Sequence, residues 1–238
     1  MAISLGTSDT VFLWLTDPKP SLNAHILCNP LDSKEYMALL CFKNGSLTRE
    51  RIRDECAEGS WQLFSDLLDS TPRGNFGNIG MYFDLVEILP AVVGDYRFNK
   101  NNELIHRFSK EVEVRALVEG QFLAKRVHAE DLGFSVHSAS RIIATGGAST
   151  NKSLIQVLAD VFNMPVYVLE IPNSACLGSA LRAKHGLLGE DFPFQNMFAE
   201  PLGLHLSCSP AKDAAQVYGP MLTRYRMLQE KLVKKEKF

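Results

Sequence analysis

The amino-acid sequence predicts an α/β domain, and three observations support this. Residues 141–169 read as a buried strand, a glycine turn, an amphipathic helix and a second strand, which is the unit from which parallel sheets are built. Other apolar runs of strand length alternate with helical patterns along the chain. The 238 residues are 46% hydrophobic, which is enough to bury a sizeable core in one domain.

Charge and cysteine content exclude several classes of function. The net charge of −2 gives no electrostatic reason to bind nucleic acid or an anionic membrane. No apolar run has the length of a membrane span, and the six histidines show no zinc-binding spacing. The five cysteines form no C-x-x-C pair, which is typical of reduced thiols. We therefore expect a cytoplasmic protein with no nucleic-acid partner, no membrane partner and no metal site of its own.

The chain opens with a predicted β-hairpin. Residues 2–5 and 10–15 are the strands, and Gly6-Thr7-Ser8-Asp9 is the turn. The turn offers a glycine, two hydroxyls and backbone N–H groups, which can hold a phosphate, although most hairpin turns bind no ligand. We expect Asp9 to form the turn rather than to act as a base. Because the domain begins inside a hairpin, we expect further sequence upstream.

A strand and a helix follow around a second glycine. The apolar run 36–42 predicts a buried strand, and Asn44-Gly45 ends it. Ser46 or Thr48 is expected to cap a helix that runs to about residue 57. Gly45 allows either a ligand to approach the backbone or simply a turn.

The next hundred residues contain a short helix and a long one. In the helix at 61–68, Trp61 is expected to be a core anchor rather than a wall for a flat ring. A strand is expected at 79–83, and residues 90–104 look irregular. The helix at 113–131 carries Gly120, which costs about 1 kcal/mol in mid-helix and predicts a close neighbour. Glu119 and Lys125 fall outside its apolar side.

The predicted strand at 141–145 ends in Gly146-Gly147, which is either a ligand site or a tight turn. One of residues 149–151 is expected to cap the next helix, whose N–H groups would face the same crevice. A strand follows at 166–169.

The C-terminal part mixes helices and loops. The small residues of 173–181 predict a helix that packs tightly or lies beside a ligand. Residues 190–215, with three prolines, look like loop. A last helix is expected at 218–231 with Pro220 in its first turn.

Four motifs together resemble the C-terminal domain of the FGGY carbohydrate kinases. In order, they are Gly6-Thr7-Ser8-Asp9, Asn44-Gly45-Ser46, Glu119-Gly120 and Ala144-Thr145-Gly146-Gly147-Ala148. A finer match over 4–10, 38–46 and 112–117 is similar to the xylulose kinase branch of that family. The resemblance covers residues 1–238, with 190–238 as a C-terminal loop and helix extension. It implies an actin-like, ribonuclease-H-like ATPase domain with a mixed sheet flanked by helices.

The resemblance also implies a substrate and a site. In the intact protein, the γ-phosphate of ATP, with Mg²⁺, would be transferred to D-xylulose to give D-xylulose 5-phosphate. The implied ATP-binding residues are Gly6, Thr7, Ser8, Gly45, Ser46, Trp61, Gly146, Gly147, Ala148 and Asn151.

One departure from the family pattern limits this expectation. The family's catalytic aspartate lies in a Gly-Asp-Asn-Pro-like segment before the hairpin, and neither that segment nor the N-terminal sugar-binding domain occurs in these 238 residues. We therefore expect the chain alone to bind Mg–ATP weakly at best and not to phosphorylate D-xylulose. The alternatives are a ribulose, glycerol or other polyol kinase of the family, an inactive truncated nucleotide-binding module, and an unstable truncation. Whether the protein is a monomer or a homodimer is left open.

Overall fold

The computed structural model describes residues 1–32, 34–137, 140–169, 171, 173–189, 192–197 and 203–235. Its strands are β1 (Ala2–Leu5), β2 (Asp9–Leu15), β3 (His25–Cys28), β4 (Tyr36–Phe42), β5 (Ile79–Phe83), β6 (Gly94–Phe98), β7 (Leu104–Ile105), β8 (Ile142–Thr145), β9 (Val166–Leu169) and β10 (Leu204–Cys208). Its α-helices are α1 (Ser46–Ala57), α2 (Trp61–Asp69), α3 (Lys110–Asp131), α4 (Lys152–Phe162), α5 (Ser174–Leu188) and α6 (Ala214–Lys235). Short 3₁₀ helices are η1 (Asn75–Gly77), η2 (Gly147–Thr150) and η3 (Phe194–Met197).

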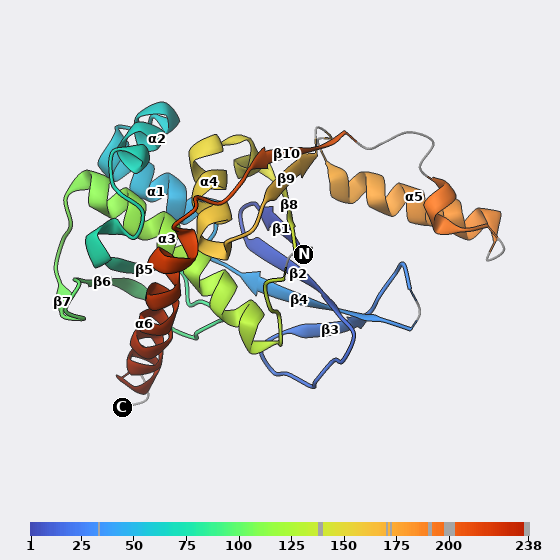
Figure 1. Cartoon of the computed structure of the whole chain (residues 1–238), viewed down its shortest axis with the longest axis horizontal. Coiled ribbons are helices and arrows are strands. Elements are labelled where there is room, and N and C mark those ends of the chain that lie inside the picture. The colour runs from blue at the N-terminus through green and yellow to red at the C-terminus, as the bar shows by residue number, and fades with distance from the viewer. Residues whose placement is uncertain are drawn as a thin grey trace.

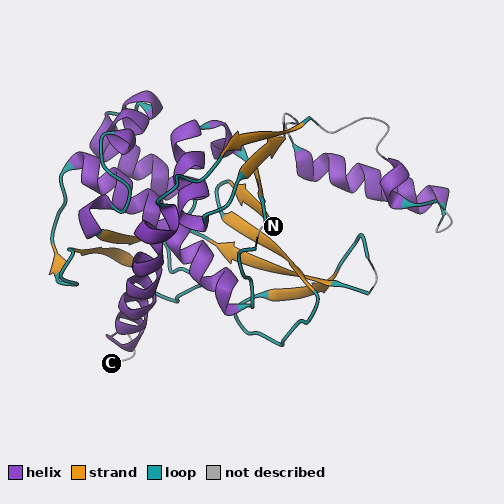
Figure 2. Cartoon of the chain, in the orientation of Figure 1, coloured by secondary structure: helices purple, strands orange, loops and turns teal. Residues whose placement is uncertain are grey.

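The main sheet is mixed, with strand order β10-β9-β8-β1-β2-β4-β3. Strands β1, β8 and β9 are parallel, and the remaining pairs are antiparallel. Ile3 of β1 lies opposite Val11 of β2 and Ala144 of β8, and all three are buried. Figures 1 and 2 show α1–α4 and α6 gathered beside this sheet. The expected fold class, a mixed sheet flanked by helices, is confirmed.

Helix α3 is the centre of the helical layer. It packs against β5, α1, α2, α4 and α6. A Cβ added to Gly120 would lie 1.9 Å from the carbonyl oxygen of Gly80 in β5, so the expected close approach is confirmed. Glu119 and Lys125 were expected outside the packed side, which is wrong, because both are buried. Most of the helix is buried, and Glu119 and Lys125 form ion pairs inside the fold with Arg115 and Asp9.

Two stretches expected as irregular contain strands. Residues 190–215 include β10, which pairs antiparallel with β9, and residues 90–104 include β6, which pairs with β5. Both strands carry polar or exposed residues, so neither shows the apolar run that marks a buried strand. Strand β10 lies at the edge of the main sheet, and β6 is the middle strand of the small sheet β5-β6-β7; both are held by backbone pairing with their neighbours and need no apolar run.

Helix α6 begins earlier than expected. It starts at Ala214, so Pro220 lies inside the helix and not in its first turn. The proline ring removes the helical hydrogen bond to the carbonyl of Gln216. Packing against α3 and α4 compensates for this, and Tyr218 and Tyr225 are buried there. Residues 190–238 therefore include a strand and a helix that complete the core.

Helix α5 extends away from the rest of the chain (Figure 1). None of its residues is buried, and a Cβ on Gly178 would meet no atom within 4 Å. The expectation that this helix packs tightly is therefore wrong for the part of the chain described, because no other element covers its small side chains.

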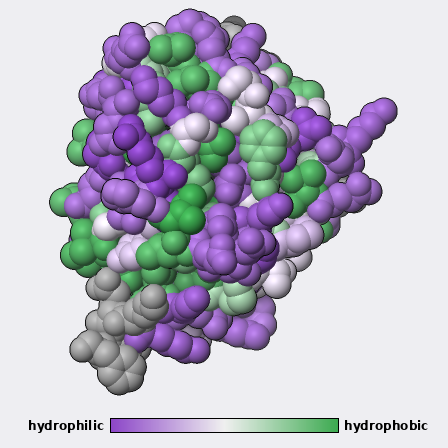
Figure 3. Space-filling model, turned by 90° about the vertical axis from the view of Figure 1, so that its left-hand side faces the viewer, coloured by the Kyte–Doolittle hydropathy of each residue, from purple (hydrophilic) through white to green (hydrophobic). Residues whose placement is uncertain are grey.

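The side of the molecule formed by α1, α2 and β7 is largely hydrophilic, with hydrophobic residues scattered over it (Figure 3). No helix among the described segments has the length and hydropathy needed to cross a membrane.

We predict that Gly120→Ala destabilises the fold by at least about 2 kcal/mol, because the new methyl group collides with the backbone of β5. The matched control is Gly178→Ala, which places a methyl group in open space on α5 and should leave global stability unchanged. Urea denaturation of both variants measures the difference. Equal stabilities for Gly120→Ala and the native chain would contradict the packing described for α3.

Candidate functional site

A cavity of about 800 Å³ opens between the β1–β2 turn, α1, α2 and the start of α4. Its volume lies within the range of roughly 300–1,000 Å³ that is usual for small-molecule sites. Of the ten residues that the sequence implied for ATP, seven line it: Gly6, Thr7, Ser46, Trp61, Gly147, Ala148 and Asn151. Three segments far apart in the sequence therefore meet around one hollow.

The other three residues, Ser8, Gly45 and Gly146, do not line the cavity. A Cβ on Gly45 would lie 2.6 Å from the carbonyl oxygen of Thr7, and one on Gly146 would lie 2.5 Å from that of Leu5. Gly146 also has a φ of +84°, which disfavours any other residue. Both glycines let backbone segments touch behind the cavity. The turn interpretation of Gly45 therefore fits the structure better than direct approach to a ligand.

The β1–β2 turn has backbone N–H groups both with and without a hydrogen-bond acceptor. The N–H of Gly6 donates to Asp9 Oδ1 at 3.1 Å, and the carbonyl of Gly6 accepts from the N–H of Ser46 at 2.8 Å. Within the described residues, no hydrogen bond uses the N–H of Thr7 or Ser8. Two adjacent N–H groups in a turn form a concave donor site that suits an anion.

A buried ion cluster lies beneath this turn. Asp9 Oδ2 accepts from Arg49 Nη1 at 2.8 Å and from Lys125 Nζ at 2.9 Å, and Asp9 Oδ1 accepts from Arg49 Nη2 at 3.0 Å. The three side chains are between 0% and 1% exposed. Asp9 forms the turn, as expected, but it also binds two cations that the sequence did not associate with it. No local pattern could reveal this, because the partners lie on α1 and α3.

Burial and charge act against each other on the pKa values of this cluster. Burial favours the neutral form of Asp9, but Lys125 and Arg49 outweigh it and hold the pKa of Asp9 below its usual value. Burial lowers the pKa of Lys125, and attraction to Asp9 offsets only part of that shift. Asp9 is therefore ionised at neutral pH.

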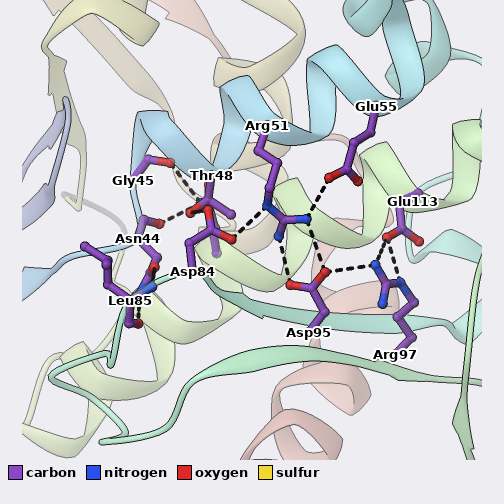
Figure 4. A network of polar contacts seen from close by, with 11 residues as sticks. Asn44, Gly45, Thr48, Arg51, Glu55, Asp84, Leu85, Asp95, Arg97 and Glu113 are labelled. Atoms are coloured by element: carbon purple, nitrogen blue, oxygen red, sulfur yellow. Dashed lines mark hydrogen bonds and ion pairs between the residues drawn. The ribbon is translucent and has the colours of Figure 1, made fainter.

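Helix α1 is fixed from its other side by polar contacts with the β5–β6 region (Figure 4). Gly45 occupies the N-cap position and no side chain caps the helix, so the expected cap by Ser46 or Thr48 is wrong. The hydroxyl of Thr48 donates to Asp84 at 2.8 Å instead, and Arg51 pairs with the same carboxylate. These contacts fix the first turn of α1, which includes Ser46, at the wall of the cavity.

The opposite wall is formed where α4 meets α2. Asn151 is the N-cap of α4: its Oδ1 accepts from the N–H of Leu154 at 3.1 Å, as one of the expected caps. Its Nδ2 donates to Ser65 Oγ at 3.0 Å, and Ser153 Oγ donates to Asp69 at 2.7 Å. Two side-chain hydrogen bonds therefore fix the first turn of α4 to α2. The contribution of Ser65, Ser153 and Asp69 was missed, because no sequence spacing links the two helices.

Trp61 belongs to this wall and not to the core. Its side chain is 39% exposed, whereas Phe64 on the same helix is fully buried. The indole makes an edge contact with Phe64 at 5.4 Å between ring centroids, and the Arg53 guanidinium lies 4.7 Å from its ring centroid. The expectation of a core anchor is therefore wrong. Trp61 is the first residue of α2, at the rim of the cavity, where it offers an aromatic surface to a flat ligand.

The carboxylates at the cavity, Glu50, Asp66 and Asp69, do not converge on one point. In the described part of the chain, no group of three or more His, Cys, Asp or Glu side chains could hold a metal ion. Mg²⁺ is commonly bound by one or two carboxylates together with substrate phosphates.

A mixed sheet, a turn with unused N–H groups and two helix starts around one cavity define an α/β domain with a cavity that suits a phosphate-bearing ligand. The profile of the FGGY family of carbohydrate kinases, C-terminal domain, matches residues 1–187, and the chain belongs to that family.

The relatives support this assignment over almost the whole chain. A xylulose kinase of Rattus norvegicus is 53% identical over 99% of this chain, and xylulose kinase 2 of Arabidopsis thaliana is 43% identical over 99%. The chain spans 44% and 46% of those two proteins, which is less than half of their length.

Solved structures share the fold. The xylulose kinase of Rhodospirillum rubrum superposes with a TM-score of 0.79 over 97% of this chain and 46% of that chain, at 20% identity. A ligand-bound xylulose kinase of Lactobacillus acidophilus gives a TM-score of 0.78 over 97% of this chain and 47% of that chain, at 21% identity. The fold is therefore the actin-like, ribonuclease-H-like ATPase fold that the resemblance implied.

We predict that Asp9→Ala destabilises the chain by about 3–5 kcal/mol, because it leaves Arg49 and Lys125 buried without a counter-charge. Lys125→Met should cost less, about 1–2 kcal/mol, because Asp9 keeps its pair with Arg49. Chemical denaturation of the two variants measures both values. A larger loss for Lys125→Met than for Asp9→Ala would contradict the charge assignment of the cluster.

Proposed function

We propose that this chain is the nucleotide-binding half of a carbohydrate kinase and that ATP, with Mg²⁺, binds in the cavity. The observation that carries the proposal is the meeting of the β1–β2 turn, the start of α1, the start of α4 and Trp61 around one hollow. The N–H group of Thr7, which lines the cavity, suits the phosphates, and the indole of Trp61 suits the base. Gly147 has no atom near its Cβ position, so backbone there is open to a ligand.

We further propose that the intact protein transfers the γ-phosphate of ATP to D-xylulose. This rests on the names of the rat and Arabidopsis relatives, which are xylulose kinases at 53% and 43% identity. The fold does not discriminate between sugars, because a gluconate kinase of Lactobacillus acidophilus superposes with a TM-score of 0.78. A glycerol kinase of Plasmodium falciparum superposes with a TM-score of 0.64. Another sugar or polyol of the family is therefore the alternative substrate.

The 238-residue chain is proposed to bind ATP without transferring its phosphate. The three carboxylates at the cavity come from α1 and α2, and two of them, Asp66 and Asp69, already accept hydrogen bonds from Gln62 and Ser153. We assign none of them as a general base. Because all five cysteines are free thiols, we place the protein in the cytoplasm.

Gly147→Asp is predicted to weaken binding of Mg–ATP by at least about tenfold, because a carboxylate in the cavity repels the phosphates. The position is open, so the variant should fold as the native chain does. Gly147→Ala is the matched control and should bind within about twofold of native. Isothermal titration calorimetry measures all three. Native-like binding by Gly147→Asp would exclude this cavity as the ATP site.

A coupled kinase assay with D-xylulose, D-ribulose and glycerol is expected to give no turnover above the blank for the 238-residue chain. Phosphate transfer requires both a positioned nucleotide and an acceptor hydroxyl that is aligned with its γ-phosphate. A chain that positions only the nucleotide is therefore not expected to catalyse the reaction. Turnover that Gly147→Asp abolishes would overturn the proposal that the chain is inactive by itself, and the preferred acceptor would then identify the substrate.

A further inference from the structure

An arginine lies over the indole of Trp61 without lining the cavity. The guanidinium carbon of Arg53 is 4.7 Å from the centroid of the Trp61 ring. A cation within about 6 Å of an aromatic face is attracted to it, and tryptophan is the strongest such partner. Trp61 lines the cavity and Arg53 does not. The cation therefore contacts the indole without occupying the space that is open to a ligand.

The place of Arg53 follows from the face that α1 turns to the cavity. Ser46, Arg49 and Glu50 of α1 line the cavity. Arg53 is the next residue along the same face, because residues three and four apart lie on one side of a helix. Helix α1 packs against α2, and Trp61 is the first residue of α2. The face of α1 that lines the cavity therefore ends in a cation placed against the start of α2.

The guanidinium of Arg53 is held in this place by its neighbour. Asp54 Oδ1 accepts from Arg53 Nε at 2.8 Å and lies 2.6 Å from Nη2. The side chain of Arg53 is only 19% exposed, whereas that of Asp54 is 59% exposed. Because a guanidinium is planar and rigid, contacts from two of its nitrogens limit its rotation. Arg53 therefore presents a fixed surface to the indole.

The indole needs such a contact because it is not enclosed by the core. Trp61 is 39% exposed, and Phe64 touches it edge-on, with an angle of 72° between the two rings. A large side chain that is free to rotate must be ordered when a ligand binds, and this ordering lowers the affinity. A side chain that is already ordered avoids that loss. Arg53 and Phe64 together restrict the indole before a ligand binds.

We propose that Arg53 is a positioning residue for the base of the bound nucleotide. It orders the indole of Trp61, so that the indole can stack on a flat aromatic ring in the cavity. The inference rests on the proposed function and deepens it, because it assigns recognition of the base to one residue on each of two helices. Arg53 acts through Trp61 and does not touch the ligand.

The test measures the affinities of adenosine and of Mg–ATP by calorimetry on the 238-residue chain. Arg53→Met keeps an unbranched side chain beside the indole and removes the cation. Because Arg53 is at the surface and methionine adapts to its surroundings, the variant should fold. The affinity for each ligand should fall about fivefold, which is the effect of a cation–π contact at a partly exposed site. Both ligands should lose the same factor, because they share the base.

Two further variants separate the contact from a general loss of structure. Arg53→Lys restores a cation and should recover part of the lost affinity. Arg182→Met is the matched control, because Arg182 also lies over an aromatic ring, 5.9 Å from the centroid of Phe194. It belongs to α5, which contributes no residue to the cavity, so this variant should bind both ligands as the native chain does.

The possible outcomes distinguish the inference from the proposed function. Native affinities for both ligands in Arg53→Met would overturn the inference and leave the proposed function intact. A loss for Mg–ATP alone would also overturn it, because the arginine would then act on the phosphates through its charge. Equal losses in Arg53→Lys and Arg53→Met would exclude the cation as the cause. If the native chain binds neither ligand, the proposed function fails, and the inference fails with it.

A second readout needs no ligand. The sequence has two tryptophans, so Trp14→Phe leaves Trp61 as the only one, and Trp14 lies on β2 and does not line the cavity. Time-resolved fluorescence anisotropy then reports the local rotation of the Trp61 indole. Adding Arg53→Met to this chain should increase that rotation. An indole that rotates no more than before would contradict a positioning role for Arg53, even if the affinity fell.

Discussion

The carboxylate of Asp9 is the contact on which the rest of the site depends. One oxygen closes the β1–β2 turn on the N–H of Gly6, and the two oxygens together bind Arg49 of α1 and Lys125 of α3. A strand, a turn and two helices are therefore joined at a single buried group. Because an unpaired charge in this position would be costly, each partner fixes the others. The contacts of Asp9 fix the backbone of the turn, and no hydrogen bond among the described residues uses the N–H groups of Thr7 and Ser8.

Glycine contacts set how closely the remaining elements approach. Gly45 lets the start of α1 touch the turn, Gly146 lets the end of β8 touch β1, and Gly120 lets α3 touch β5. At each position a methyl group would collide with a backbone atom within 2.6 Å or less. The cavity is thus the space left between closely packed backbones, and side chains such as Trp61 line it. These three glycines have a structural role, because backbone atoms pack against them. Gly147 differs from them, because the space beside it is open to a ligand.

The sequence predicted the local features well and the distant pairings poorly. The hairpin, the strand–turn–helix unit at residues 142–162 and the cap by Asn151 follow from neighbouring residues, and the structure contains them. The exposure of Trp61 and the ion cluster depend on helices that meet only in three dimensions, so no spacing encodes them. Strand β10 was missed because an edge strand lacks an apolar run. The family resemblance predicted a ligand-binding role for seven residues that line the cavity. The local sequence pattern alone did not decide between a ligand site and a structural role for them.

The most direct test of this account is a titration of ¹⁵N-labelled chain with Mg–ATP, followed by amide chemical shifts. We predict the largest shifts at the N–H groups of Thr7 and Gly147, together with the indole N–H of Trp61, because all three residues line the cavity. The N–H of Gly6 should shift little, because Asp9 already accepts its hydrogen bond. Shifts confined to α5 or to the β3–β4 end of the sheet, with none in the β1–β2 turn, would contradict it.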